Sequence, residues 1–402
     1  MSLQGTITAD ADNEAPSLRR GREHPDDAPM IRVLHSADWQ IGRLYGSFDP
    51  DDAVPLAEAR FAAVERLAAL AASEKVDAVL VAGDVFDAQT VSARTIRRLF
   101  NALAGYAGPW IMIPGNHDAA LAESVWSHAA RLEALPANLH LVLEPRVVEF
   151  PQQGLALLCA PLTQRHTFGD LTEWFDACET PAGWHRIGMA HGAVQGVLAE
   201  DIDSANPIAP DRARRAKLDY LALGDWHGTK CIDERTWYSG TPEPDRFKAN
   251  DSGQALLVEI DQPGVLPRVT PIPVGQYRWG QVARRLDIAS DLDGVIDTLG
   301  KVEAKDVLEL TVAGQVDLDG YRRLQAAQGI AHARARSLRV DLSDLRFTPT
   351  AEDIASLHAD GYLGEVIAEL LDTVGDDARR AQDALTILTG LLSERNARGI
   401  TP

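Results

Sequence analysis

The chain has 402 residues and a formal net charge of −20, with 45% hydrophobic and 24% charged residues. This length allows a sizeable core and more than one domain, and no stretch approaches the roughly 18 consecutive apolar residues of a membrane span. The acidic balance argues against a chain that binds nucleic acid through its overall charge, because such proteins neutralise phosphates with excess Lys and Arg. It leaves open DNA binding through a local basic groove, a metal ion or a partner.

Residues 1–29 are acidic and polar and contain proline, without the apolar segment of a secretory signal. We expect this stretch to be a disordered tail, and Met30, directly before the first predicted strand, is an alternative translation start. The three cysteines are widely spaced and form no CxxC pair. An odd, unpatterned set indicates a chain without disulfides that folds in the reducing cytoplasm.

Apolar runs alternate with amphipathic stretches from residue 31 to about residue 275. Helical spacing predicts helices around residues 61–70 and 95–103. Strands that alternate with helices indicate an α/β layered domain, and the loss of helices late in this region favours a mixed sheet or a sandwich. The predicted strands are residues 31–34, 78–82, 110–113, 155–159, 187–190, 218–223, 255–260 and 269–274.

The pattern changes after residue 275. Three predicted strands and two helical stretches form a compact β-α-β-α-β unit within residues 276–347. Residues 348–402 have the apolar spacing of helices. These helices either pack back on the body or form a docking segment for a partner, and the sequence favours neither.

Five polar clusters each follow an apolar run directly. Strand ends at one edge of a sheet share a rim where α/β folds bind ligands, so we expect the clusters to form one site. Carboxylate and amide oxygens suit magnesium and manganese, and imidazole extends the choice to zinc and iron. One such motif alone is weak evidence for a metal site, whereas all five in this order are strong evidence for one. The clusters are His35-Ser-Ala-Asp38-Trp-Gln40, Gly83-Asp84-Val-Phe-Asp87, Gly115-Asn116-His117-Asp118, His191-Gly192 and Gly224-Asp225-Trp-His227-Gly228.

A carboxylate such as Asp84 can bridge two cations about 3.5–4 Å apart, the arrangement used in two-metal phosphoryl hydrolysis. Two such ions would polarise the phosphoryl oxygens, supply a hydroxide nucleophile and hold the geometry of displacement. Glycines beside the predicted ligands, such as Gly83 and Gly115, allow the backbone to approach a metal or substrate closely. The clusters therefore predict a two-metal phosphoesterase.

The ordered motifs resemble those of the calcineurin-like metallophosphoesterases. Within that superfamily, LHSADWQIGR followed by GDVFD and GNHD is most similar to the SbcD-type DNA repair exonucleases. The motif-bearing part runs from about residue 31 to residue 247. The resemblance implies a four-layer α/β/β/α sandwich at residues 30–275. The unit at residues 276–347 is similar to the small α+β capping domain of that nuclease group, and C-terminal helices follow it.

The resemblance also implies seven metal ligands in two positions, with Asp84 bridging both. For the first position it implies Asp38, Gln40 and His227. For the second position it implies Asn116, His191 and Asp225.

The same resemblance implies that His117 faces the phosphate without binding metal, so that it stabilises the transition state or protonates the leaving oxygen. With Asp84 it forms the expected catalytic pair. Asp87 and Asp118 are expected to hydrogen-bond to the ligands rather than coordinate metal. Thr241 lies in the loop at residues 238–246, which resembles the family's loop beside the active site, and is expected to support the ligands or contact substrate.

Two positions depart from the common family pattern. Gln40 stands where a His usually binds the first metal, and Asp225 stands where a His usually binds the second. Both replace an imidazole with an oxygen donor, so we predict a harder site that prefers manganese or magnesium over zinc. The departures also admit a weaker first position or a catalytically reduced protein.

Three functions stay open. The first is a metal-dependent phosphodiesterase acting on DNA, an exonuclease or endonuclease subunit similar to SbcD. That resemblance implies a coiled-coil ATPase partner of the SMC-like class, and a homodimer is a further option. The second is a phosphatase or phosphodiesterase for nucleotides or other small molecules, which the acidic charge favours slightly. The third is a regulatory subunit whose site no longer turns over.

The densest basic run of the chain covers Arg212, Arg214, Arg215 and Lys217, just before a predicted strand. It is either a solvated helical face or a contact to the phosphate backbone.

Overall fold

The structure is a computed structural model that describes residues 29–197, 205–288, 290–348 and 362–374, together with residues 377, 380, 381, 383–385, 387, 388 and 391. The tail predicted at residues 1–29 therefore lies almost entirely outside the described residues, as does most of the segment after residue 348. Within these ranges, no helix combines the length and the apolar character that crossing a membrane requires.

The first six-stranded sheet carries the first three motifs. Its strands are β1 (Ile31–Ser36), β2 (Ala78–Ala82), β3 (Trp110–Ile113), β4 (Leu139–Leu141), β13 (Gln254–Ile260) and β14 (Arg268–Pro273). Their order is β14-β13-β1-β2-β3-β4. Strands β1 to β4 pair in parallel, and β13 is antiparallel to both β1 and β14. Because β1, β2 and β3 are parallel neighbours, the motifs that follow them meet at one edge.

The second six-stranded sheet carries the other two motifs. Its strands are β5 (Arg146–Phe150), β6 (Leu155–Ala160), β7 (His185–His191), β10 (Tyr220–Gly224), β11 (Lys230–Cys231) and β12 (Thr236–Tyr238). Their order is β11-β12-β10-β7-β6-β5, with the outer strands β5 and β11 antiparallel to their neighbours. Gly224 at the end of β10 pairs with His191 at the end of β7, so the last two motifs also leave the sheet side by side.

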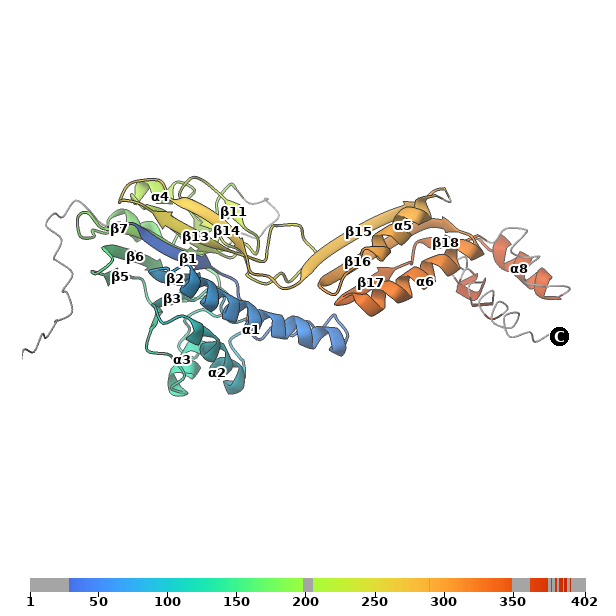
Figure 1. The fold of residues 1–402 in the computed structure, drawn as a ribbon, viewed down its shortest axis with the longest axis horizontal. Coiled ribbons are helices and arrows are strands. Elements are labelled where there is room, and N and C mark those ends of the chain that lie inside the picture. Colours follow the sequence, from blue (N-terminus) through green and yellow to red (C-terminus); the bar gives the residue numbers. More distant parts are fainter. Residues whose placement is uncertain are drawn as a thin grey trace, which may run out of the picture.

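Alternation along β2 explains how the two sheets pack. Ala78 and Leu80 face the second sheet, in a core that includes Leu157 and Ile187. Val79 and Val81 face the opposite way, as side chains do at alternate positions of a strand, and join the core under the helices. A mixed α/β fold with two mixed sheets is therefore confirmed, and Figure 1 shows it on the left.

Helices cover the outer faces of both sheets. The helices α1 (Pro50–Ser73), α2 (Ala93–Ala102) and α3 (Val125–Arg131) pack on the first sheet. The second sheet is covered by the short helices η2 (Glu173–Asp176) and α4 (Arg212–Arg215). Proline at the start of α1 and two aspartates in its first turn favour a helix start there, well before the predicted residue 61. The remaining short elements are η1 (Leu103–Gly105), β8 (Ala193–Val194) and β9 (Pro207–Ile208).

A third, all-parallel sheet follows, on the right in Figure 1. Its strands are β15 (Arg278–Leu286), β16 (Asp306–Val316), β17 (Ser337–Asp341) and β18 (Leu345–Phe347). The helices α5 (Asp291–Gly300) and α6 (Leu318–Arg334) share a separate apolar core with it. This is the predicted β-α-β-α-β order with one further strand, β18, which pairs with the end of β16.

An aromatic cluster joins the third sheet to the start of α1. Tyr45 and Phe48, just before α1, pack with Phe247 and with Trp279 of β15. The described part of the C-terminal segment includes α8 (Tyr362–Asp372), whose Ile367 is buried against α6.

Candidate metal centre

The loops after β1 and β2 are hydrogen-bonded to each other. Asp38 N donates to Gly83 O at 3.1 Å, and Gln40 N donates to Asp84 O at 2.9 Å. Asp38, Gln40 and Asp84 have φ angles of 56°, 43° and 53°, and Asp225 has a φ of 103°. Non-glycine residues seldom adopt positive φ, and such strained positions concentrate at functional sites. Four of the seven predicted ligands therefore hold a backbone conformation that non-glycine residues seldom adopt.

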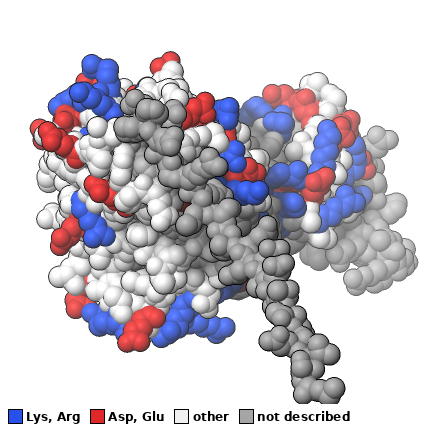
Figure 2. All heavy atoms as spheres, turned by 60° about the vertical axis from the view of Figure 1, so that its left-hand side comes forward, with Lys and Arg blue, Asp and Glu red and all other residues white. Residues whose placement is uncertain are grey.

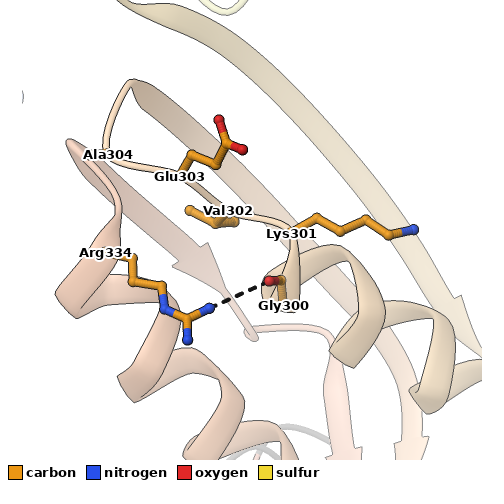
Figure 3. Close-up of a pocket in the computed structure, with 6 residues that line it drawn as sticks. All are labelled: Gly300, Lys301, Val302, Glu303, Ala304 and Arg334. Atoms are coloured by element: carbon orange, nitrogen blue, oxygen red, sulfur yellow. Dashed lines mark hydrogen bonds between the residues drawn. The ribbon is translucent and has the colours of Figure 1, made fainter.

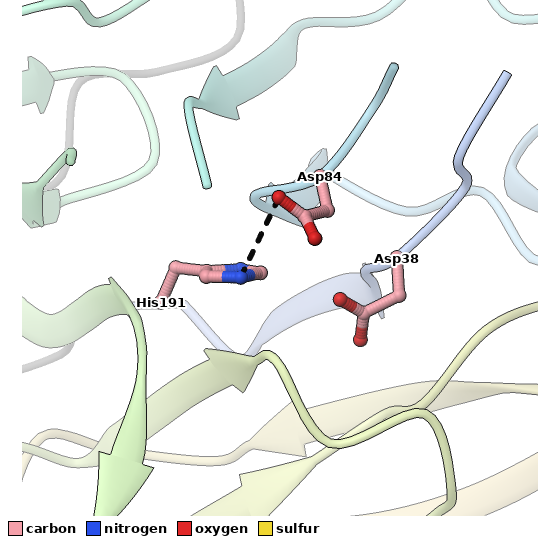
Figure 4. Close-up of side chains that lie close together, drawn as sticks. All are labelled: Asp38, Asp84 and His191. Atoms are coloured by element: carbon pink, nitrogen blue, oxygen red, sulfur yellow. Dashed lines mark ion pairs between the residues drawn. The ribbon is translucent and has the colours of Figure 1, made fainter. Parts of the chain in front are cut away.

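Asp38, Asp84 and His191 come from three different strand ends and point toward one another, as Figure 4 shows. Each is buried, and each offers one ligand atom such that all three atoms lie within 4.8 Å of one another. Burial raises the pKa of Asp38 to about 6. Burial also lowers the pKa of His191, but the charges of Asp84 and Asp38 outweigh it and raise that pKa to about 9. Buried carboxylates and an imidazole form a donor set that fits a divalent cation.

The second predicted metal position is assembled around the Nε2 atom of His191. The ring's Nδ1 donates to Ala82 O at 2.8 Å, which leaves Nε2 with a free lone pair in the neutral ring. Nε2 lies 2.9 Å from Asn116 Oδ1, 3.6 Å from Asp84 Oδ1 and 3.7 Å from Asp225 Oδ1. All four residues predicted for this position thus lie together.

The first predicted position is arranged differently. His227 Nδ1 donates to Asp245 Oδ2 at 3.0 Å, so Nε2 is the acceptor nitrogen of the neutral ring, and Arg246 Nη2 lies 3.3 Å from it. Gln40 Nε2 lies 3.2 Å from that His227 nitrogen. Gln40 Oε1 instead accepts a 2.6 Å hydrogen bond from Arg43. Gln40 is therefore present at the site, but its only oxygen donor faces an arginine.

His117 lies at the opening of the centre, with its side chain 40% exposed. Its Nδ1 donates to the main-chain oxygen of Asp87 at 2.7 Å, and its Nε2 lies 3.9 Å from Asp84 Oδ2. His117 N also donates to Asp84 Oδ1 at 2.9 Å. Asp87 thus orients His117 through its backbone rather than through its carboxylate.

Asp118 and Thr241 are buried next to the centre. Asp118 accepts hydrogen bonds from Gly115 N and Phe86 N, at 2.7 and 3.1 Å, and so joins two of the motifs. Burial is the main cause that raises the pKa of Asp118 to about 7. The Thr241 hydroxyl donates to Glu243 O at 3.0 Å, so this hydrogen bond lies within the loop at 238–246.

The main functional residue that the sequence did not reveal is Asp245, which is buried beside His227. It also contacts three arginines: Arg43 at 3.3 Å, Arg60 at 3.5 Å and Arg246 at 2.9 Å. Although burial opposes it, the hydrogen bond to His227, helped by the arginines, holds the pKa of Asp245 well below its usual range. The only sequence signal is an acidic residue within the loop at 238–246, and nothing in the sequence pairs it with His227.

Two other charged regions lie apart from the centre. Arg212 is buried and pairs with Asp170 and Asp176, each at 2.6 Å, so the basic run at 212–217 is only partly a solvated face. A hollow lined by residues 300–304 and Arg334 lies beside α5 and α6 (Figure 3). There Arg334 donates to Gly300 O at 3.5 Å, and none of the predicted site residues takes part.

Comparison with known proteins agrees with this geometry. Residues 31–258 match the calcineurin-like phosphoesterase family. The chain belongs to that family. The match spans all five motifs and both six-stranded sheets except for β14 and the last two residues of β13.

Relatives within the family include nuclease subunits. The SbcD component of the nuclease SbcCD from Rhodobacter capsulatus is 43% identical over 291 residues, which cover 60% of this chain and 69% of the relative. The same component from Bacillus subtilis is 25% identical over 350 residues, covering 76% of this chain and 85% of the relative. Among solved structures, a dimetal phosphatase from Danio rerio matches with a TM-score of 0.39 and 13% identity, covering 60% of this chain and 99% of that chain.

Replacing Asp84 by Asn tests the centre through stability. We expect Mn²⁺ at 100 times its Kd to stabilise the wild-type protein by about 2.7 kcal/mol, because it binds only the folded state. Asp84→Asn should abolish most of that gain. Without metal it should unfold at a higher temperature than the wild type, because one buried charge is removed.

Thermal unfolding with Mn²⁺ and with a chelator measures both effects. Asp211→Asn, which changes an exposed carboxylate before α4, is the control and should behave as the wild type. An Asp84→Asn protein that keeps the full Mn²⁺-dependent stabilisation would contradict the assignment.

Proposed function

We propose that the chain is a metal-dependent phosphodiesterase that cleaves DNA, as the nuclease subunit of a complex similar to SbcCD. The observation that carries the proposal is the convergence of Asp38, Asp84 and His191 at the strand ends, with Asn116 and Asp225 beside them. The similarity to nuclease subunits over 69% of the relative's length supports DNA as the substrate.

In this proposal two divalent ions would supply positive charge at the phosphoryl oxygens and activate a water. Manganese is the preferred ion and magnesium the alternative. Asp84 would hold both ions. The oxygen-rich set, with Asp225 in place of an imidazole, favours these hard cations over zinc.

His117 is the proposed acid for the leaving oxygen. Its Nδ1–H is held by the carbonyl of Asp87, so a proton that it transfers must come from Nε2. As the attacking oxygen forms its bond to phosphorus, the bond to the leaving oxygen breaks and that oxygen takes the Nε2 proton. The imidazole is then left neutral, with its Nδ1–H still on Asp87.

Local positive charge near the centre supports a DNA substrate despite the acidic chain. Trp226 stands between two predicted ligands, and the ammonium groups of Lys230 and Lys248 lie 5.3 and 4.6 Å from the centre of its ring. Lysines can bind backbone phosphates, and an aromatic ring can stack on a base. Elsewhere acidic and basic side chains are interspersed on the coloured part of the face in Figure 2. Positive charge that could bind DNA phosphates is therefore present beside the centre, at Lys230 and Lys248.

We further propose three functional parts. Residues 30–275 form the four-layer catalytic domain and residues 276–347 a capping domain, which the Tyr45 and Trp279 rings hold next to it. The segment at 348–402 would bind the coiled-coil ATPase partner. In α8, Ile367 packs against α6, whereas Tyr362, on the other side of the helix, is 77% exposed. One face thus packs on the body, and another stays available to a partner helix.

Hydrolysis of linear duplex DNA with Mn²⁺, compared with a panel of nucleotides, tests the proposed activity. We expect DNA to be cleaved, and His117→Ala to lower the rate by about 10²–10⁴-fold, the usual contribution of an acid–base group. Mn²⁺ binding should persist in this variant because His117 is not a ligand. The exposed His166→Ala is the matched control and should keep the wild-type rate.

Turnover of nucleotides but not DNA would instead support a small-molecule phosphodiesterase. An unchanged DNA cleavage rate in His117→Ala would contradict the role of His117. Absence of any turnover would support a regulatory subunit, the alternative that Gln40 and Asp225 motivate.

Substituting the exposed face of α8 tests the proposed partner site. Tyr362→Asp places a charge on that face, and we expect the variant to lose co-purification with the ATPase while still cleaving DNA. The control is Leu266→Asp, at a 49%-exposed position outside α8, which should keep the association. Retained association of the α8 variant would place the docking site elsewhere.

A further inference from the structure

The two cation positions of the proposed centre differ in what they offer a metal, and the inference here rests on the proposed function. The second position surrounds the Nε2 atom of His191. Within 3.7 Å of this nitrogen lie the Asn116 side-chain oxygen and one carboxylate oxygen each of Asp84 and Asp225. Every one of these groups can donate electrons to a cation. This position requires no rearrangement of the amide or the imidazole.

At the first position, an amide NH₂ group occupies the place of a ligand atom. Gln40 Nε2 and Arg246 Nη2 lie 3.2 and 3.3 Å from His227 Nε2, the ring nitrogen that does not donate to Asp245. A cation there would need His227 Nε2 and the Gln40 oxygen together. Of these two atoms, only His227 Nε2 is oriented to bind a cation.

Arg43 fixes the Gln40 amide in this orientation. Its Nη1 atom lies 2.6 Å from Gln40 Oε1 and 3.3 Å from Asp245 Oδ2. Turning the amide over would set its NH₂ group against the guanidinium and its oxygen against the His227 lone pair. Both new contacts would be repulsive, because guanidinium has only donors. The present orientation is therefore the stable one while Arg43 stays in place.

Arg43 also opposes a cation directly through its charge. Arg43 can make way for a cation only by moving its side chain. Its side chain is 30% exposed, which leaves it room to do so. Two positive groups a few ångströms apart repel each other.

We propose that Arg43 and Gln40 form a pair that competes with the first metal ion, so that the chain holds its two cations very unequally. One ion binds tightly at Asp84, Asn116, His191 and Asp225. A second binds weakly at Asp38, Gln40 and His227, and only after Arg43 releases the Gln40 oxygen. Removing an active-site arginine should then strengthen metal binding, an effect that a merely structural role for Arg43 does not produce.

Counting Mn²⁺ ions tests the proposal. After desalting, the full-length wild-type protein should retain one Mn²⁺ per chain, and Asn116→Ala should lose it. Gln40→His should retain two. In Mn²⁺ titrations followed by electron paramagnetic resonance, Arg43→Ala should bind the second ion about tenfold or more tightly than the wild type, because a neighbouring positive charge is gone.

The control is Arg131→Ala, an exposed arginine on α3 paired with Glu123, which should match the wild type. Thermal unfolding of each variant verifies that it folds. The number of Mn²⁺ ions retained by the wild-type protein tests the proposal even if a variant fails to fold. Two tightly held ions in the wild type, or an unchanged second affinity in Arg43→Ala, would overturn the proposal. Ion counting requires no DNA cleavage, so this failure is distinct from failure of the proposed nuclease activity.

Discussion

The structure depends most on two carboxylates, Asp38 and Asp84, buried together where adjacent parallel strands end. A buried charge is costly unless it is paired or coordinates a metal. The protein itself supplies part of that compensation, since His117 N donates to Asp84 and Asp225 N donates to Asp38. Burial lowers the pKa of His191, but the remaining negative charge outweighs it and raises that pKa to about 9. This excess of buried negative charge is what a divalent cation would neutralise.

A second buried charge, on Asp245, connects the centre to the third sheet. Asp245 orients His227 and contacts Arg60, which is itself buried. Arg60 in turn donates to the Tyr45 hydroxyl at 2.9 Å, and the Tyr45 ring packs 6.1 Å from that of Trp279 in β15. A buried arginine is stable only while its acidic partner is present. The packing of the third sheet and the orientation of a predicted metal ligand are thus joined through one network.

The sequence predicted the strand cores of both large sheets and the five clusters at their ends, because continuous apolar runs and the polar residues that follow them are local patterns. It missed the short strands β4, β5, β11 and β12, whose pairing depends on neighbours rather than on their own composition. It placed Gln40 at the centre but could not orient its amide, because that depends on Arg43 and His227 together. Asp245 was missed for the same reason: its partner lies 18 residues away along the chain.

The claim on which the account rests is that Asp84 organises a divalent-metal centre. Anomalous diffraction from crystals grown with Mn²⁺ tests it most directly. The account predicts a strong peak in contact with the oxygens of Asp84 and Asn116 and the Nε2 atom of His191. A manganese peak elsewhere in the molecule, with none in contact with Asp84, would contradict it.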